Sequence, residues 1–80
     1  MNIRIYNIWG RKDFLYIYYS KYKEDGHIHY SAVQCYSITG KLIREKKVNS
    51  NLYVTGNSDK LICFYFDKEK DKIYFKYEDY

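Results

Sequence analysis

The sequence predicts an all-β protein, and three observations lead to that prediction. Short stretches of alternating polarity recur along all 80 residues, as expected of strands with two different faces. β-Branched and aromatic residues, including 12 tyrosines, fill these stretches, and the four glycines fall between them. Proline is absent. We therefore expect a single domain, residues 1–80, built as a small antiparallel meander of six to seven short strands that form a barrel or a two-layer sheet.

Seven segments carry the strand pattern, and each ends at a turn sequence. In chain order they are Asn2–Ile8, Phe14–Lys23, His27–Ser37, Lys41–Val48, Leu52–Val54, Lys60–Phe66 and Lys72–Glu78. The first three are rich in Ile and Tyr, the fifth is short, and the last two are rich in Phe and Tyr. The fourth is less certain, because Lys41-Leu-Ile-Arg-Glu-Lys-Lys also suits a helix. A helix at Lys41–Val48 would make the fold α+β.

The turn Glu24-Asp25-Gly26 restricts how the second and third segments pair. A two-residue Asp-Gly loop places Ile17 opposite Gln34, whereas a three-residue loop with a left-handed Gly26 places Ile17 opposite Val33. We prefer the second register, because it separates an aliphatic core face from a tyrosine-rich face. This tyrosine-rich face would be either a second core layer or an interface. It would comprise Phe14, Tyr16, Tyr18, Tyr22, Ile28, Tyr30 and Tyr36.

The last two segments form a second predicted hairpin, with Lys68-Glu-Lys-Asp71 as a four-residue loop. One face then pairs Phe66, Phe64 and Ile62 with Ile73, Phe75 and Tyr77. The other face brings Leu61, Cys63 and Tyr65 together with Tyr74, Lys76 and Glu78. Because the first face is entirely apolar, we expect it to be core and the mixed face to be the outer one.

Length and composition limit the class of protein. A chain of 80 residues builds only a marginal core, so we expect a homodimer or a higher homo-oligomer. The sequence starts directly with alternating residues and shows no signal peptide or apolar run of membrane-spanning length. Two cysteines make no disulfide framework, which favours a reduced, cytoplasmic protein. Residues with AT-rich codons dominate, as in low-GC bacteria and their phages; for a phage protein, the location would be the host cytoplasm.

Patterns that would indicate catalysis or metal binding are weak. His27 and His29 share one side of a predicted strand and could join Cys35 or Cys63 around zinc, but neither cysteine belongs to a CxxC pair. Both cysteines lie in apolar runs, and the acidic residues gather at turns. There is no glycine-rich phosphate loop and no serine nucleophile motif. We expect a non-enzymatic protein with no catalytic residue, no metal site and no cofactor.

A protein-binding module is the function that the sequence favours. Tyrosine, tryptophan and arginine dominate the binding energy of protein interfaces, and an aromatic sheet face is a ready contact surface. The predicted partner-binding residues are Trp9, Arg11, Tyr16, Tyr18, Tyr22, Tyr30, Tyr36 and Arg44. A small domain of this composition fits a phage or mobile-element inhibitor that occludes a host defence protein stoichiometrically.

Binding of single-stranded nucleic acid or a nucleotide is the alternative. The same tyrosines could stack on bases while nearby basic residues contact phosphates. Those basic residues are Lys21, Lys23, Lys41, Arg44, Lys46 and Lys47. The formal net charge of +4 is mild, and the sequence lacks the RNP motif of an RRM domain.

Overall fold

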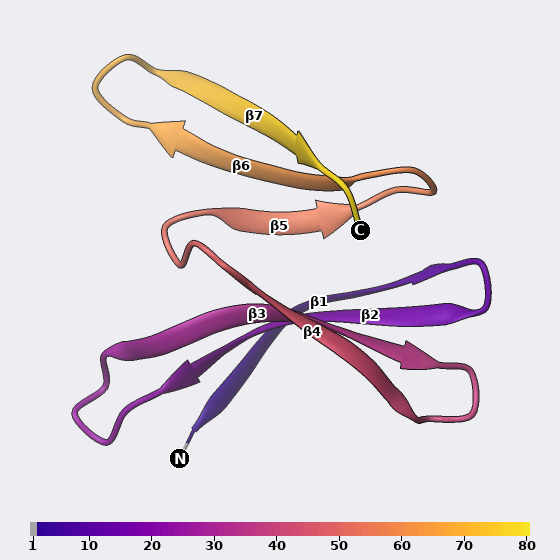
Figure 1. Ribbon diagram of the computed structural model, residues 1–80. Helices are drawn as coiled ribbons and strands as arrows, with labels where there is room; N and C mark the ends of the chain where they lie inside the picture. The colour runs from indigo at the N-terminus through magenta and orange to yellow at the C-terminus, as the bar shows by residue number, and fades with distance from the viewer. Residues whose placement is uncertain (1) are drawn as a thin grey trace.

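The computed structural model describes residues 2–80 and confirms the predicted all-β class. Over this range the chain forms seven antiparallel strands and no helix (Figure 1). The strands are β1 (Ile3–Arg11), β2 (Phe14–Tyr22), β3 (Ile28–Ser37), β4 (Leu42–Val48), β5 (Tyr53–Gly56), β6 (Leu61–Asp67) and β7 (Lys72–Glu78). Within residues 2–80, accordingly, no helix has the length and apolarity needed to cross a membrane. The first strand continues beyond its predicted end at Ile8, so Trp9 and Arg11 belong to β1.

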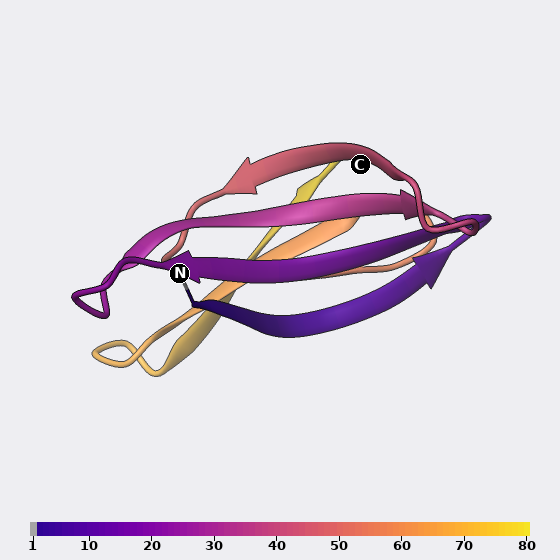
Figure 2. The ribbon, with the colours of Figure 1, turned by 90° about the horizontal axis from the view of Figure 1, so that it is seen from below.

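The strands form two separate sheets, each a simple meander. The order is β1-β2-β3-β4 in one sheet and β5-β6-β7 in the other, and the strands of the two sheets cross at an angle in Figure 2. Of the two predicted architectures the two-layer packing is formed, and the sheets do not close into a barrel. The helical alternative at Lys41–Val48 is wrong, since β4 pairs with β3 and its Val48 packs on the core. Pairing with β3 thus outweighs the helix propensity of the lysines and glutamate.

The loop between β2 and β3 has the predicted conformation. Gly26 has a φ of +88°, in the left-handed region that glycine adopts at little cost. The Lys23 amide donates a hydrogen bond to the His27 carbonyl at 2.8 Å, which leaves Glu24-Asp25-Gly26 as the loop. The three-residue loop is therefore confirmed.

The register beyond this loop differs from the preferred one because β3 contains a bulge. His29 is an extra residue in β3, and it shifts every later pair by one position. Ile17 consequently lies opposite Gln34, and the prediction that it faces Val33 is wrong. The observed pairs are Leu15–Tyr36, Tyr16–Cys35, Ile17–Gln34 and Tyr18–Val33.

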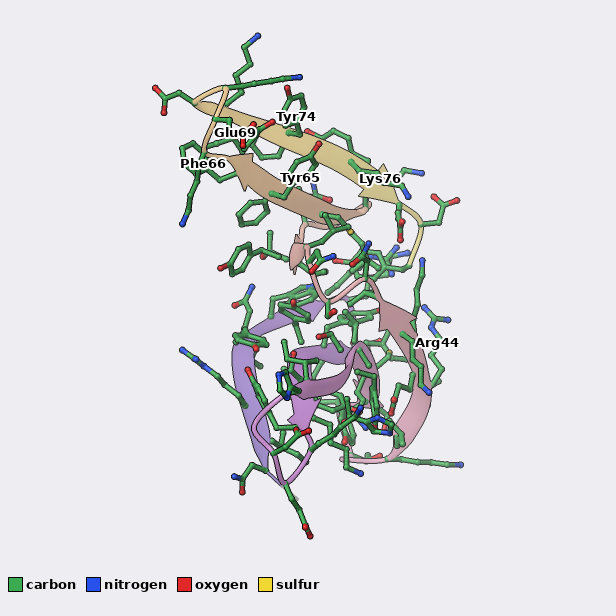
Figure 3. The ribbon with its side chains drawn as sticks, turned by 90° about the vertical axis from the view of Figure 1, so that its left-hand side faces the viewer. Arg44, Tyr65, Phe66, Glu69, Tyr74 and Lys76 are labelled. Atoms are coloured by element: carbon green, nitrogen blue, oxygen red, sulfur yellow. The ribbon has the colours of Figure 1, made fainter. Side chains whose placement is uncertain are left out.

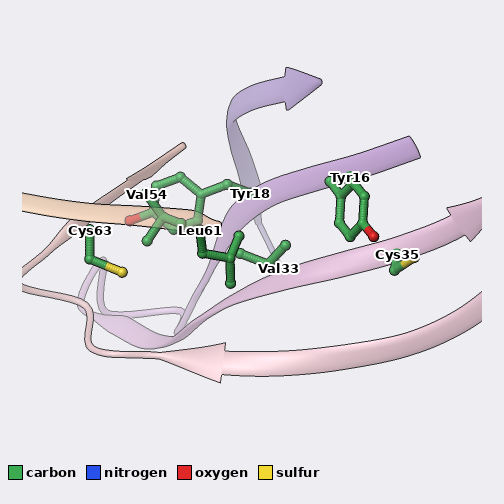
Figure 4. Packing of buried hydrophobic residues seen from close by; sticks show 7 residues of the cluster. All are labelled: Tyr16, Tyr18, Val33, Cys35, Val54, Leu61 and Cys63. Atoms are coloured by element: carbon green, nitrogen blue, oxygen red, sulfur yellow. The ribbon is translucent and has the colours of Figure 1, made fainter. Parts of the chain in front are cut away.

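The shifted register makes tyrosine, and not isoleucine or leucine, the core residue of β2. Tyr16 and Tyr18 are 2% and 3% exposed between the two sheets. Leu15 and Ile17, the predicted core residues, lie on the opposite face of their sheet, where Leu15 is exposed. The buried cluster, drawn in Figure 4, comprises Tyr16, Tyr18, Val33, Cys35, Val54, Leu61 and Cys63.

The β6–β7 hairpin has the predicted register but turns its other face to the core. Asp67 pairs with Lys72, which leaves the predicted four-residue loop at residues 68–71. The predicted pairs Phe66–Ile73, Phe64–Phe75 and Ile62–Tyr77 are all present. However, Leu61 and Cys63 are the buried residues, so the face expected to be outer is the core face. These smaller side chains, with Val54, leave room for the large rings of β2 opposite them.

Candidate functional site

Trp9 and Arg11, predicted as contact residues, hold the C-terminal tyrosine in place. The Trp9 indole donates a hydrogen bond to the Tyr80 hydroxyl at 2.8 Å, and that hydroxyl donates to the Asn57 carbonyl at 2.7 Å. The Arg11 guanidinium lies 4.4 Å from the centre of the Tyr80 ring, and its Nε donates to the Ser58 carbonyl. These contacts give both residues a structural role.

Tyr16 and Tyr18, also predicted to contact a partner, lie in the core. Tyr16 stacks on Trp9 with ring centroids 5.7 Å apart. The Tyr18 hydroxyl donates to the Leu52 carbonyl at 2.8 Å, so the buried polar atom has a partner. Burial is the largest cause that raises the pKa of Tyr18 to about 12, and the neighbouring Tyr6 hydroxyl raises it further. Because both side chains are covered, their assignment to a contact surface is corrected to the core.

The remaining predicted contact residues are divided between the two faces of the four-stranded sheet. Tyr22 shares a hydrogen bond of 2.7 Å with the Tyr6 hydroxyl on the core side. Tyr30 and Tyr36 lie on the opposite side, where both are half-buried. Arg44 is exposed on β4 (Figure 3). The predicted single face of tyrosines is therefore not formed, because the bulge in β3 separates its members.

Replacing Gly56 with alanine is expected to destabilise the protein by about 1–3 kcal/mol through overpacking. A Cβ atom at this position would overlap the Trp9 indole and the Tyr80 hydroxyl. Urea unfolding measures the effect, with Gly10→Ala as the control, since its Cβ would meet no atom closer than 3.9 Å. Equal stability of the two variants would show that Tyr80 is not packed against Gly56.

A large apolar surface lies on the outer side of the three-stranded sheet. We call it the aromatic face, and it comprises Tyr53, Ile62, Phe64, Phe66, Ile73, Phe75 and Tyr77. It is the face that the sequence predicted to be core. Not one of its seven side chains is charged. Its pairing was predicted correctly, but its exposure was missed, because a uniformly apolar strand face normally indicates burial.

The rings of the aromatic face form a continuous layer across the three strands. Tyr53 of β5 stacks on Phe64 of β6 with ring centroids 5.6 Å apart, and Phe64 lies 6.1 Å from Phe75 of β7. Five of its side chains remain exposed to between 49% and 64%: Phe66, Ile73, Tyr53, Phe75 and Tyr77. At about 150–250 Å² for a whole aromatic side chain, they expose roughly 500 Å². An uncovered apolar patch of this size typically marks an interaction site.

The outer half of the β6–β7 hairpin is aromatic on its other face as well. Figure 3 shows Tyr65 and Tyr74 side by side on the two strands, with Lys76 further along β7. Their rings stack with centroids 5.0 Å apart, and Tyr65 is 42% exposed. The hairpin therefore presents rings on both sides near its loop.

The outer face of the four-stranded sheet contains a depression lined by aliphatic, aromatic and polar side chains. One part has a volume of about 510 Å³ and is lined mainly by Phe14, Leu15, Ile38 and Tyr36. An adjoining part of about 310 Å³ also includes Tyr36. Isoleucines 3, 5 and 8 of β1 are more than half exposed on the same sheet. This surface has fewer aromatic side chains than the aromatic face.

The two cysteines are buried in the core, whereas His27 is exposed. Cys35 and Cys63 are both buried free thiols, and burial raises the pKa of the Cys63 thiol, which disfavours the reactive thiolate. His27 is exposed next to Asp25 in the β2–β3 loop. Within residues 2–80, no three His, Cys, Asp or Glu side chains are grouped in a way that could hold a metal ion.

Comparison with known proteins finds no match. The chain matches no protein-family model, and neither the curated proteins nor the solved structures contain a match.

Proposed function

We propose that this protein is a non-enzymatic binding module that occupies a partner protein through its aromatic face. The exposed, uncharged layer of rings on β5, β6 and β7 is the observation that supports this proposal. Such residues supply most of the binding energy at protein interfaces when a partner removes them from water. The partner would present an apolar patch of similar size.

The way these side chains are held also suits binding. They stand on strands in regular pairing, and neighbouring rings pack on one another, so they have little freedom left to lose when a partner binds. Affinity then depends on the apolar area covered, and it changes little with salt because the face has no charged side chain.

We further propose that the protein is cytoplasmic and encoded by a phage or mobile element. In that setting it would inhibit a host defence protein by covering one of its surfaces in a stoichiometric complex. Self-association is also part of the proposal, since a chain of 80 residues with open strand edges leaves much apolar surface uncovered.

One observation supports the nucleic-acid alternative on a different surface. The Lys47 ammonium lies 4.7 Å from the Tyr30 ring centre and Lys21 lies 6.0 Å from it, on the outer side of the four-stranded sheet. This arrangement combines a ring with two cations, as base stacking beside phosphate contacts requires. Tyr16 and Tyr18 no longer contribute to such a surface, because they are buried.

Affinity capture from the native host tests the two alternatives. Wild-type protein is expected to retain a protein partner at high salt, whereas the variant Tyr53→Lys with Phe66→Lys is expected to lose it. Both side chains are about half exposed, so the variant should fold. The matched control is Ile5→Lys with Ile8→Lys, at 55% and 53% exposure on the other sheet.

Two results would contradict the assignment. Equal capture by both variants would exclude the aromatic face as the contact. Recovery of RNA, DNA or a nucleotide, with a steep loss between about 50 and 200 mM salt, would support the alternative.

A further inference from the structure

Each sheet ends in two edge strands, and three of the four are poorly suited to pair with another chain. β1 has a register shift between Ile5 and Asn7 and contacts β5, which has only four residues. β4 carries four consecutive charged residues at positions 44–47, which discourage pairing at an edge.

β7 has neither a register shift nor a run of consecutive charged residues, and it is longer than β5. It has seven residues and pairs with β6 without a register shift. It is the outermost strand of its sheet, and in the described part of the chain no strand pairs with its free edge (Figure 1). An open and regular edge of this length favours the addition of another strand.

The sequence of β7, Lys72-Ile-Tyr-Phe-Lys-Tyr-Glu78, is complementary to itself about Phe75. When a second copy lies antiparallel with Phe75 opposite Phe75, Lys72 lies opposite Glu78 of the second copy at both ends. Opposite charges directly across a strand pair stabilise it. We propose that two copies of this chain pair through β7 in this register to form one continuous six-stranded sheet.

Both faces of the combined sheet receive favourable pairs in this register. On the aromatic face Ile73 lies opposite Tyr77 of the second copy, and the two Phe75 rings meet at the twofold axis. On the other face Tyr74 lies opposite Lys76, which places a cation beside an aromatic ring.

Neighbouring registers are less favourable. A shift by two residues in one direction pairs Lys72 with Lys76 of the second copy, and a shift in the other pairs Lys76 with itself. Like charges directly opposite each other destabilise a strand pair. A shift by one residue would join the aromatic face of one copy to the core face of the other. The pairing of charges and the matching of the two faces together select the register centred on Phe75.

This inference rests on the self-association proposed above and identifies the strand that carries it. The dimer places two aromatic faces side by side, so that one assembly presents a double binding surface. A partner with two copies of the target patch would then bind with avidity. The dimer is measurable on purified protein alone, so it can fail independently of partner binding through Tyr53 and Phe66.

Cysteine cross-linking tests the register. Directly opposite residues of an antiparallel pair have Cα atoms about 4.5–5.5 Å apart, within the range for a disulfide. Mild oxidation is therefore expected to join Phe75→Cys into a covalent dimer. Ile73→Cys, the control on the same face, is expected to remain unlinked, because its two cysteines lie about 13 Å apart along the strands. The native thiols at Cys35 and Cys63 are buried.

Charge exchange tests the pairing without altering the aromatic face. Lys72→Glu alone places two glutamates opposite each other at each end of the pair, and Glu78→Lys alone places two lysines there. Each variant is therefore expected to sediment with a weaker dimer than wild type. Glu78→Lys also removes the ion pairs of Glu78 with Lys46 and Lys76 of its own chain, which mixing does not restore. In an equimolar mixture, a dimer of one copy of each variant has opposite charges at both ends. The mixture is therefore expected to dimerise as strongly as the wild-type protein. Each variant keeps its own fold on mixing, so a recovery reports the contact between copies. A monomeric wild-type protein, or equal cross-linking at positions 73 and 75, would overturn the proposal.

Discussion

Replacing Tyr16 and Tyr18 together with alanine is expected to unfold the protein, not to remove a binding surface. Both rings are buried at the centre of the only core that joins the two sheets in the described chain. Each aromatic-to-alanine change in a core costs about 3–5 kcal/mol. A domain of 80 residues has a total stability of only about 4–12 kcal/mol at typical values per residue.

Circular dichroism and urea unfolding of this double variant give the measurement. Tyr30→Ala with Tyr36→Ala is the control, because these half-buried rings on the outer face are expected to leave the protein folded. Tyr18→Phe separates packing from hydrogen bonding, since it keeps the ring but leaves the Leu52 carbonyl without its donor. The loss of this hydrogen bond is expected to lower the free energy of unfolding by about 1–3 kcal/mol. A cooperatively folded Tyr16→Ala, Tyr18→Ala protein of near wild-type stability would contradict the described core.

Raising the pH above 10 is expected to unfold the protein cooperatively. Burial raises the pKa of Tyr18 from 10.0 to about 12, and it raises the pKa values of Tyr16 and Tyr19 as well. The folded state therefore keeps protons that the unfolded chain releases. The stabilisation is fully present below pH 10 and is lost as the pH rises toward 12. For Tyr18 alone, two pKa units correspond to about 2.7 kcal/mol.

Tyrosinate absorbance and circular dichroism, followed together against pH, test this expectation. The two signals should change in one transition above pH 10, and Tyr18→Phe should make stability fall less steeply with pH. Ionisation of all twelve tyrosines in a protein that remains folded at pH 12 would show that the buried hydroxyls are open to solvent.

The same two tests bear on the functional alternatives. A nucleic-acid surface built on Tyr16 and Tyr18 requires exposed rings whose removal leaves the fold intact. If their removal unfolds the chain, base stacking is left to Tyr30 beside Lys47 and Lys21. The aromatic face is unaffected by this result, because its residues belong to the other sheet.

Local pattern was sufficient for most of the strands and for one complete hairpin. Gly26 and its neighbours predicted the three-residue loop, and residues 68–71 predicted the four-residue loop with all its cross-strand pairs. These features depend on interactions between residues that are close in sequence, where turn chemistry and alternation act directly. At Lys41–Val48 the same local information was ambiguous, and pairing with β3 decided for a strand.

The bulge at His29 could not be predicted from the local sequence pattern. The sequence there, His27-Ile-His-Tyr30, has no glycine or other sign of an irregular strand. The extra residue places Val33 and Cys35 on the same face as Tyr16 and Tyr18. This face is buried against the second sheet, and Leu15 on the other face is exposed. The predicted face of tyrosines was divided for this reason, although β2 and β3 were both predicted as strands.

By itself, the sequence determined the strands other than β4, the loops of the β2–β3 and β6–β7 hairpins and the pairing within the second of these hairpins, since all of these depend on alternation and turn chemistry along short stretches. Tertiary structure alone decided which face of each sheet is buried. Both faces of β2 and of β6 are apolar enough to form a core, so the choice depends on how large side chains from one sheet fit small ones from the other. The fit of Tyr16 and Tyr18 against Val54, Leu61 and Cys63 leaves the aromatic face in solvent, and the candidate site is there because of that packing.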